Sequence, residues 1–542
     1  MDSRRLVLLL VFTFSLMMLW DAWQKQSQPK PAVSNAPAAP SAAAVPTPTL
    51  TAAPPSPVPV TASLAPATGA KATVRTDLYT AEVSAQGGDM VRLELNRHHA
   101  SDDPGKAFVL FDGGEKHVYE GQSGLIGAGL PNHKTLYRLA AGSYELKDGQ
   151  DTLELRLEAD AENGFKTAKI LTFHRGSYLI DVSHEIVNGG AAAVSPHAYF
   201  QIARDGKEAE AKSTMGASTF TGPAVYTEQD KYQKINFSDV DKGKAKFAEK
   251  ADNGWIAMVQ HYFVVAWLPQ DKTEREFFVR KIGDDLYAAG VIVPVGTVAP
   301  GTTARVTVPL YAGPQEQDKL AKIAPGFELV VDYGWLTVIA APLFWVLEML
   351  HRLVANWGWA IILLTILIKL AFFPLSAASY KSMAKMRLLT PKLSKLKELY
   401  ADDRQRLNQE MMELYKREKI NPLGGCLPIV VQIPVFIALY WVLLGTVEMR
   451  GAPWLGWITD LSVKDPYYVM PLIMGATMLV QTRLNPTPPD PIQAKIMWLM
   501  PIVFTGMFLF FPAGLVLYWT VNNLLSIAQQ WQITRMIESR KK

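Results

Sequence analysis

The chain has 542 residues, a formal net charge of +4 at pH 7 and a hydrophobic fraction of 49%. This length allows more than one domain, and the small net charge gives no support to a nucleic-acid-binding function. The single cysteine, Cys426, excludes an intrachain disulfide and a cysteine-based metal cluster. Nearly all long apolar runs follow residue 335, whereas residues 25–330 have the composition of a water-soluble region.

The amino terminus resembles a signal sequence. Arg4 and Arg5 precede the apolar run 6–20, in the order expected for the basic and apolar regions of a signal peptide. The run ends in WDAW, which lacks the small-x-small pattern of a cleavage site. Residues 1–23 are therefore predicted to form an uncleaved signal-anchor helix with a cytoplasmic N-terminus. A cleaved signal peptide is the alternative.

The composition changes again at about residue 73. Residues 24–72 are rich in Pro, Ala, Ser and Thr, which predicts a disordered or extended tether. In residues 73–325, short segments alternate apolar and polar side chains, as at Val91, Leu93 and Leu95. Further strand-like runs include 153–157, 170–173, 178–182, 255–259, 262–267 and 305–310, and helical periodicity occurs at 315–324. Many short strands with Gly-rich turns predict a large all-β domain, a β-sandwich.

Residues 73–325 contain most of the nine histidines, but no HExxH pair and no clustered ligand spacing. We therefore predict no metal site, cofactor or catalytic centre, and expect the His and Asp residues of this domain to lie at the surface or in turns. A cleft that binds carbohydrate or a partner protein stays open, although no motif supports it.

Residues 326–350 mix aromatic and charged side chains. The segment contains Trp335 and Trp345 together with Glu348, and Pro342 divides it. This pattern predicts an amphipathic helix at the outer membrane interface. A full transmembrane span is the alternative.

Five apolar spans follow, each approaching the length needed to cross a bilayer. The predicted spans are 351–375, 426–447, 467–482, 496–512 and 513–534; they are joined by a helical hairpin at 376–425 and loops at 448–466 and 483–495, and are followed by a basic tail at 535–542. The hairpin, the second loop and the tail are basic, whereas the loop 448–466 is not. The positive-inside rule therefore predicts six spans including the anchor, both termini in the cytoplasm and the β-domain outside.

The hairpin combines apolar and basic side chains. Methionines and leucines recur at helical spacing with lysines between them. Met383 and Met386 belong to the apolar stripe, and Lys385 and Arg387 to the basic face. We interpret these four residues as a candidate contact for hydrophobic client segments or for the ribosome, since methionine-rich surfaces adapt to varied partners. Packing of the stripe on itself and on the membrane surface is the alternative.

Lys369 lies inside the apolar run WAIILLTILIKLAFFPL, and the other long apolar stretches have no ionisable residue in their interiors. A charge at membrane depth costs several kcal/mol and usually marks a functional site. Thr365 shares the helix face of Lys369. Polar and amphipathic residues on other spans that we expect to line a common positively charged groove are Gln432, Tyr518, Trp519, Asn522 and Asn523. Alternatively, Lys369 extends its ammonium group to the interface.

Several stretches resemble one family. They are NPLGGCLP at 421–428, DPYYVMPLIMG at 465–475, MPIVFT at 500–505, FPAGLVLYW at 511–519 and SMAKMR at 382–387. Together they resemble the YidC membrane-protein insertase family over residues 356–535. The anchor, tether and large β-domain resemble the Gram-negative bacterial form, in which that domain is a periplasmic β-sandwich.

The resemblance implies an insertase of the bacterial inner membrane that works without ATP, alone or beside the SecYEG translocon and its accessory proteins. Nascent membrane proteins are its expected clients, membrane lipids its surroundings, and a hydrophilic groove open to the cytoplasm and inner leaflet its expected site. The family usually has arginine where this chain has Lys369, and a tyrosine pair where it has Tyr518 and Trp519. A transporter, an intramembrane hydrolase and an envelope scaffold are alternatives. The sequence shows no paired intramembrane carboxylates, and no serine on the Lys369 face of its own span.

Overall fold

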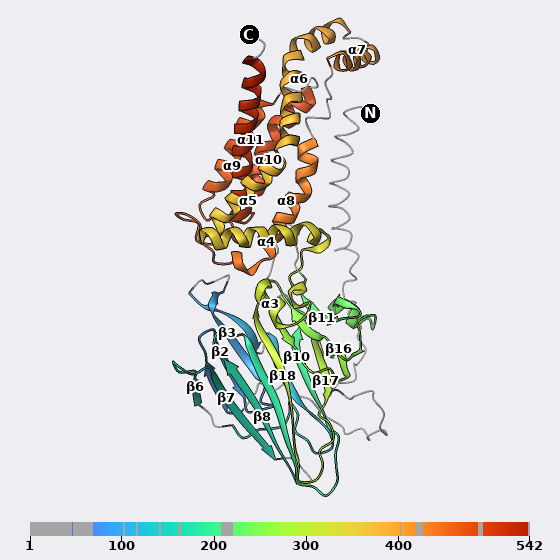
Figure 1. The fold of residues 1–542 in the computed structure, drawn as a ribbon, viewed down its shortest axis with the longest axis vertical. Helices are drawn as coiled ribbons and strands as arrows, with labels where there is room; N and C mark the ends of the chain where they lie inside the picture. Colours follow the sequence, from blue (N-terminus) through green and yellow to red (C-terminus); the bar gives the residue numbers. More distant parts are fainter. Residues whose placement is uncertain are drawn as a thin grey trace. The chain divides into compact units, whose positions relative to one another are not determined.

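The computed structural model describes residues 46, 69–100, 103, 105–114, 117–139, 142–160, 164–207, 220–400, 403–418, 427–485 and 491–539. The predicted signal anchor, nearly all of the predicted tether and the last residues of the basic tail lie outside these ranges. The described residues form a β-domain followed by a set of helices (Figure 1).

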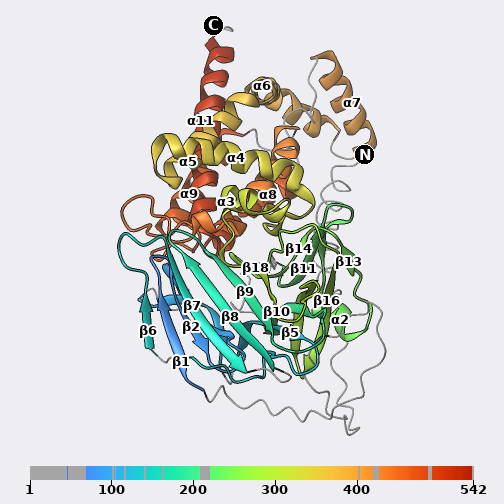
Figure 2. The same cartoon turned by 60° about the horizontal axis from the view of Figure 1, so that its bottom comes forward.

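The β-domain contains two large sheets. Its strands are β1 (Lys71–Arg75), β2 (Tyr79–Ser84), β3 (Met90–His99), β4 (Ala107–Gly113), β5 (Val118–Ile126), β6 (Gly142–Glu145), β7 (Thr152–Asp160), β8 (Phe165–His174), β9 (Leu179–Asn188), β10 (His197–Asp205), β11 (Gly222–Thr227), β12 (Lys231–Lys234), β13 (Lys250–Ala251), β14 (Trp255–Val259), β15 (Phe263–Trp267), β16 (Arg275–Gly283), β17 (Leu286–Pro294) and β18 (Thr303–Pro314). The ten-stranded sheet has the order β13-β16-β17-β10-β5-β4-β3-β2-β1-β6, and the eight-stranded sheet β12-β11-β14-β15-β18-β9-β8-β7. Figure 2 shows β7, β8, β9 and β18 side by side.

The alternation read from the sequence corresponds to the two faces of these strands. On β3, Val91, Leu93 and Leu95 are buried while the intervening side chains are partly exposed. Two of the predicted strand-like runs, 170–173 and 178–182, form a hairpin around residues 175 and 176, because β8 and β9 pair in an antiparallel register from Phe173 and Ile180 outward. The prediction of a large β domain is therefore confirmed.

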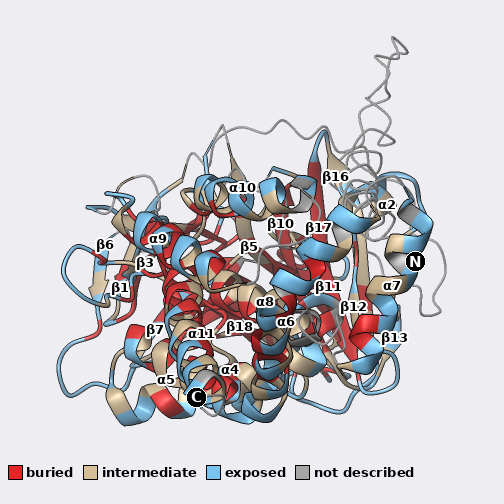
Figure 3. Cartoon of the chain, turned by 90° about the horizontal axis from the view of Figure 1, so that it is seen from above, coloured by how far each residue is buried: buried red, intermediate tan, exposed pale blue. Residues whose placement is uncertain are grey.

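Aromatic side chains from both sheets form the core between them. Phe200 on β10 lies 5.1 Å from Trp267 on β15, measured between ring centroids. Phe108 on β4 stacks on Phe263 of β15 at 4.1 Å. In Figure 3 the buried residues, drawn red, follow the strands. Because each sheet buries one row of side chains against the other, the two sheets form the packed sandwich that the alternation predicted.

The expectation that the His and Asp residues of this domain lie at its surface or in turns is wrong for His184, which is almost fully buried on β9. Asp89 directly follows a turn, but it is buried as well. Both belong to a polar cluster between the sheets. The Lys169 ammonium donates to the Asp89 carboxylate at 3.2 Å and to the Gly87 carbonyl at 2.9 Å. Burial of these groups is tolerated because each has hydrogen-bond partners.

The helices are α2 (Phe237–Asp241) and α3 (Gln317–Ile323) in the β-domain, then α4 (Thr337–Val354), α5 (Trp357–Ala371), α6 (Phe373–Leu399), α7 (Arg404–Arg417), α8 (Leu427–Gly445), α9 (Val469–Leu484), α10 (Pro491–Phe508) and α11 (Ala513–Ser539); short 3₁₀ turns are η2 (Phe327–Val330), η3 (Gly334–Leu336) and η5 (Val447–Met449). Helix α11 packs against α5, α6, α8 and α9. It is therefore the element that brings the other apolar helices together.

The segment 326–350, predicted to be one amphipathic helix, consists of short turns followed by the start of a longer helix. Residues 326–336 form η2 and η3, and a continuous helix, α4, begins only at Thr337 and passes through Pro342 to Val354. Among the described helices, α4 alone is long and apolar enough to cross a membrane by itself. Helix α5 and the first part of α6 are long and apolar enough only when they are taken together, as one span that is bent. Apolar helices within α8, α9 and α10 are shorter. The six-span topology and the interfacial position of 326–350 therefore stay predictions.

The helix that carries Lys369 ends earlier than the predicted boundary at 375. Helix α5 stops at Ala371, and α6 begins at Phe373 after a bend of 67°. Pro374 explains the break, because proline fits the first turn of α6 but has no N–H to donate to the carbonyl of Leu370, four residues earlier on α5. Lys369 consequently lies in the last turn of α5, where the helix dipole favours a cation.

Candidate functional site

The Lys369 side chain points into the helical domain. Its residue is 6% exposed, and its Nζ donates a hydrogen bond of 2.7 Å to Oγ of Ser526 on α11. The side chain therefore does not extend outward along α5 as a lysine that reaches for the interface would. No described carboxylate forms an ion pair with this ammonium, and Ser526 is its recorded hydrogen-bond partner in the described part of the chain.

Polar groups from three helices surround this contact. Ser526 Oγ donates to the Asn522 carbonyl at 2.7 Å, one turn earlier on α11. The Asn522 side chain in turn accepts a hydrogen bond from Gln432 on α8. Thr365 is fully buried one turn before Lys369 and donates to the Ile361 carbonyl at 2.7 Å. Four of the predicted groove residues thus lie on the facing parts of α5, α8 and α11.

A small cavity adjoins this polar group. Its lining residues are Ile368, Lys369, Phe372, Leu375, Ser376 and Gln432, and its volume is about 10 Å³. This is the space that a single water molecule requires. The polar side chains expected to line a groove are therefore close together, but the cavity beside them is much too small for a peptide segment.

Tyr518 and Trp519 lie one to two turns before Ser526 and contribute an aromatic wall. Phe436 of α8 stacks on Tyr518 at 6.3 Å and meets Trp519 edge-on at 4.5 Å, measured between ring centroids. The Trp519 ring also contacts Phe504 and Phe508 of α10. Trp519 Nε1 is buried without a hydrogen-bond partner in the described chain, and Tyr518 Oη lies within reach of the Gln432 side chain. These aromatic side chains therefore present polar atoms within an otherwise apolar contact.

Asn523 faces a different helix. Its side-chain amide donates to Oγ1 of Thr477 on α9 at 3.1 Å. Because successive residues of a helix point about a quarter-turn apart, Asn522 and Asn523 cannot both face Lys369. The structure separates Asn523 from the polar group around Lys369, with which the sequence prediction had placed it.

Ser526 was not among the predicted site residues. The signal was available, since residues 518, 522 and 526 are spaced four apart and share one face of a helix. Ser526 also matters for the alternative of an intramembrane hydrolase. The sequence argued against a hydrolase because the span of Lys369 has no serine on the lysine's face, whereas the structure brings a serine from another helix. Lys369 donates to Ser526, and Ser526 donates its own proton to Asn522. In this arrangement the lysine does not act as a base towards the serine.

The hairpin formed by α6 and α7 has a small core of its own, made by Leu389, Leu393, Leu414 and Tyr415. Met383 and Met386 are half-buried, whereas Lys385 and Arg387 are exposed. The leucine stripe therefore packs within the hairpin, as the alternative interpretation expected. The basic side chains stay accessible to a partner.

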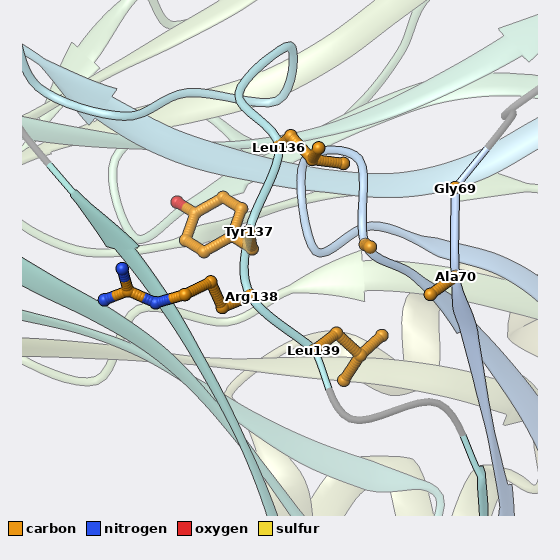
Figure 4. A pocket seen from close by; sticks show the side chains of 7 residues that line it. Gly69, Ala70, Leu136, Tyr137, Arg138 and Leu139 are labelled. Carbon is orange, nitrogen blue, oxygen red and sulfur yellow. The ribbon is translucent and has the colours of Figure 1, made fainter.

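The β-domain contains a wider hollow of about 490 Å³, between residues 69–70 at the start of β1 and the segment 136–139 (Figure 4). Leu136 is 68% exposed at its edge. Backbone hydrogen bonds to Ala85 and Glu158 hold the segment. The lining is short and mostly apolar, with Arg138 as its charged member.

Residues 71–346 match the family model described as the YidC periplasmic domain, and residues 349–541 match that of the 60Kd inner membrane protein. The membrane protein insertase YidC of Aromatoleum aromaticum is 65% identical over 100% of this chain and 99% of its own length. That of Dechloromonas aromatica is 61% identical over 99% and 98%. The chain belongs to the YidC membrane protein insertase family. A crystal structure of an active YidC insertase covers 85% of this chain and 94% of its own, with 18% identity and a TM-score of 0.39.

Membership establishes the general function. The chain is a membrane protein insertase of the inner membrane, not an enzyme, and its β-domain is periplasmic. Its clients are accordingly membrane proteins. The resemblance read from the sequence motifs is confirmed, and the helices around Lys369 belong to the inner-membrane part of this YidC family member.

Proposed function

We propose that this insertase receives the polar segment of its client between α5, α8 and α11, where Lys369 supplies the positive charge that attracts acidic client residues. The observation that carries the proposal is the Lys369 ammonium, which is buried beside one hydroxyl group and forms no ion pair with a described carboxylate. An ammonium group has three N–H donors. A client carboxylate is the partner that compensates such a charge best.

The proposal requires the site to widen when a client enters. The cavity beside Lys369 has a volume of about 10 Å³, so helices α6 or α8 must move away from α11 to admit a chain segment. The bend between α5 and α6 provides a position for such movement. Water entering with the client lowers the electrostatic cost of moving its polar residues. Apolar client segments then leave the site for lipid, where they are more stable.

Tyr518 and Trp519 fit a second part of this route. Amphipathic aromatic side chains contact apolar client segments while their polar atoms accept or donate single hydrogen bonds. Trp519 has such an atom without a partner among the described residues, and Tyr518 has one beside Gln432. We propose that they form the surface along which the client's apolar segment slides, next to the charge at Lys369.

The remaining proposals concern orientation and partners. The basic residues exposed on α6, including Lys385 and Arg387, support a cytoplasmic position of the hairpin and of both termini. They also offer a contact for the ribosome or a client leaving it. Cooperation with the SecYEG translocon and its accessory proteins, and contact with membrane lipids, complete the proposal. The β-domain then faces these partners from the periplasmic side.

Site-specific photocrosslinking tests the proposed route. A photoreactive amino acid replaces Gln432 or Tyr518 in the full-length protein, and stalled nascent chains of a single-span client are added. Crosslinks from both positions to the client's polar tail and first apolar residues are expected. The matched control is position 477, on the face of α9 that contacts α11 through Asn523. Equal crosslinking from position 477, or none from 432 and 518, would contradict the route.

A further inference from the structure

The contact between Lys369 and Ser526 joins two helices that lie far apart in the sequence. The two residues are separated by 157 positions, and their polar atoms are 2.7 Å apart. Both are buried, with exposures of 6% for Lys369 and 3% for Ser526. A buried serine that accepts from a charged donor contributes more than a hydrogen bond between neutral groups.

The position of the serine hydroxyl is set by its own helix. Ser526 Oγ donates to the Asn522 carbonyl at 2.7 Å, so its lone pairs point away from the α11 axis and towards Lys369. The Asn522 side chain is held in turn by Gln432 of α8. Tyr380 of α6 also interacts with Ser526. The acceptor offered to the ammonium is therefore fixed by two contacts of Ser526 itself, with Asn522 and Tyr380.

A lysine needs such an acceptor more than an arginine does. The ammonium is carried on a flexible four-carbon stem and has three N–H groups, whereas a guanidinium is a rigid planar fork with five. Fixing the lysine side chain loses more rotamer entropy per hydrogen bond formed than fixing the planar arginine fork. One acceptor on α11 orients the ammonium and leaves its other two N–H groups for a ligand.

We infer that Ser526 is a positioning residue for insertion: it holds the Lys369 ammonium against α11, beside the cavity that Gln432 lines, with two N–H groups directed to an incoming carboxylate. This inference rests on the proposed role of Lys369. Without the serine hydroxyl the ammonium reaches towards other oxygen atoms or the interface, and acidic client segments lose a fixed partner. The competing interpretation is that Ser526 only closes a hydrogen bond within its own helix.

Thr520 provides a matched control for that interpretation. It lies on the same helix, is 6% exposed and donates to the Val516 carbonyl at 2.7 Å. Its hydroxyl thus makes the same bond within the helix as that of Ser526, but it has no recorded contact with Lys369. Removing each hydroxyl by Ser526→Ala and Thr520→Val separates loss of a helix hydrogen bond from loss of the lysine contact.

The experiment uses full-length protein in proteoliposomes and two probes: a single-span client whose translocated tail carries aspartates, and its twin with asparagines in their place. Ser526→Ala is expected to lower insertion of the acidic client by about three- to tenfold, as for loss of one hydrogen bond of typical net strength, because the ammonium can reach other acceptors. The asparagine twin is expected to insert as with wild type. Ser526→Thr restores the hydroxyl and the activity, and Thr520→Val retains it.

A Lys369→Arg background makes the test specific. The guanidinium has enough donors to reach neighbouring acceptors without the serine, so Ser526→Ala is expected to change insertion less than about twofold there. Equal losses in the Lys369 and Lys369→Arg backgrounds, an equal loss for the asparagine twin, or no loss at all would overturn the inference.

Lys369→Gln distinguishes failure of the inference from failure of the proposed function. If Lys369→Gln impairs insertion of the acidic client but Ser526→Ala does not, the role of Ser526 is wrong and the groove charge stands. If Lys369→Gln inserts both clients like wild type, the proposed function itself fails.

Discussion

Lys169 in the β-domain and Lys369 in the helical domain are both lysines removed from water, with exposures of 2% and 6%. Their surroundings differ. Lys169 donates to the Gly87 carbonyl, the Asp89 carboxylate and the Ser123 carbonyl, at 2.9, 3.2 and 3.4 Å. All three of its N–H groups are thereby used. Lys369 has one recorded partner, the Ser526 hydroxyl, within the described helices.

The turn before Asp89 needs glycines so that Lys169 can approach the carboxylate. Gly87 and Gly88 have φ of 72° and 62°, in the left-handed region that favours glycine. A Cβ at Gly88 would lie 2.9 Å from Cδ of Lys169. Burial raises the pKa of Asp89 to about 6 and lowers that of Lys169, while their mutual attraction opposes both shifts. The β-domain therefore holds a complete structural ion pair, whereas the helical domain holds a charge available to a ligand.

The largest expected effect comes from reversing the available charge. We expect Lys369→Glu to lower insertion of an acidic-tailed client by more than about tenfold, because a repulsion of 1.4 kcal/mol already amounts to a factor of ten. Lys369→Arg keeps the charge and is expected to preserve insertion. Protease protection of the translocated tail in proteoliposomes measures both. Equal insertion by wild type and Lys369→Glu would show that the buried charge has no role with clients.

Breaking the complete pair is expected to affect stability instead. Lys169→Met leaves the Asp89 carboxylate buried without its partner, and Asp89→Asn leaves the Lys169 ammonium buried without its partner. Each substitution should therefore lower the free energy of unfolding of the β-domain by about 3–5 kcal/mol. Thermal unfolding of the full-length protein, followed by tryptophan fluorescence, measures the change. Arg156→Ala is the control, because its ion pair with Glu185 is exposed and is worth less than about 1 kcal/mol. If Lys169→Met and Arg156→Ala lower the free energy of unfolding by similar amounts, the buried ion pair is no more important for stability than the exposed one.

Sequence reasoning located one of these lysines and missed the other. Lys369 is conspicuous because every neighbour in its run is apolar or small. Lys169 lies in the strand segment FKTAKILTFH, on the same face as the buried Leu171 and Phe173. Its residue type, which is almost never fully buried, nevertheless favours a position in solvent. Only the pairing of strands far apart in the sequence shows that its side chain meets Asp89. The two sheets and the hairpin at Gly176 follow from local patterns, whereas the order of the strands does not.

The same limit applies within the helical domain. The polar residues of α5, α8 and α11 were predictable one helix at a time. Their partners were not, because the rotation of each helix decides whether a side chain meets Lys369 or α9. Asn522 and Asn523 show this, as neighbours in sequence that bond to different helices. The spacing of residues 518, 522 and 526 puts Ser526 on the polar face of α11, but its contact with Lys369 depends on how α11 lies beside α5.

Glu448 in η5 extends the comparison to a negative charge. Its Oε2 is shielded from solvent without a hydrogen-bond partner in the described chain. Burial, and to a smaller degree Glu316 and Glu348, raise its pKa to about 8. The folded protein thus binds this proton more tightly than the unfolded chain. The contribution to stability is complete below the unfolded pKa and is lost as pH rises through about 8.

We therefore expect the midpoint of thermal unfolding to fall by a few degrees between about pH 7 and pH 9, a change typical of 1 to 2 kcal/mol in a domain of this size. Glu448→Gln, which remains neutral, should remove this part of the pH dependence. The difference between the wild-type and Glu448→Gln curves isolates it from Asp89 and Glu120, whose pKa values are raised only to about 6 and about 7. Parallel curves for the two proteins would contradict the assignment.

The smallest effect is expected from exposed cations. Lys385 and Arg387 lie in water on α6, where solvent and salt screen their charge. Changing both to glutamine should weaken binding of ribosomes to proteoliposomes by about two- to fivefold at low salt, since exposed charge contacts are worth roughly 0.2–1 kcal/mol. The loss should disappear at high salt, whereas the defect of Lys369→Glu should persist because its site is buried. Sedimentation of ribosomes at two salt concentrations measures this contrast. A salt-resistant defect in the Lys385 and Arg387 variant would mean that the hairpin buries these charges in its complex, and that they act as Lys369 does.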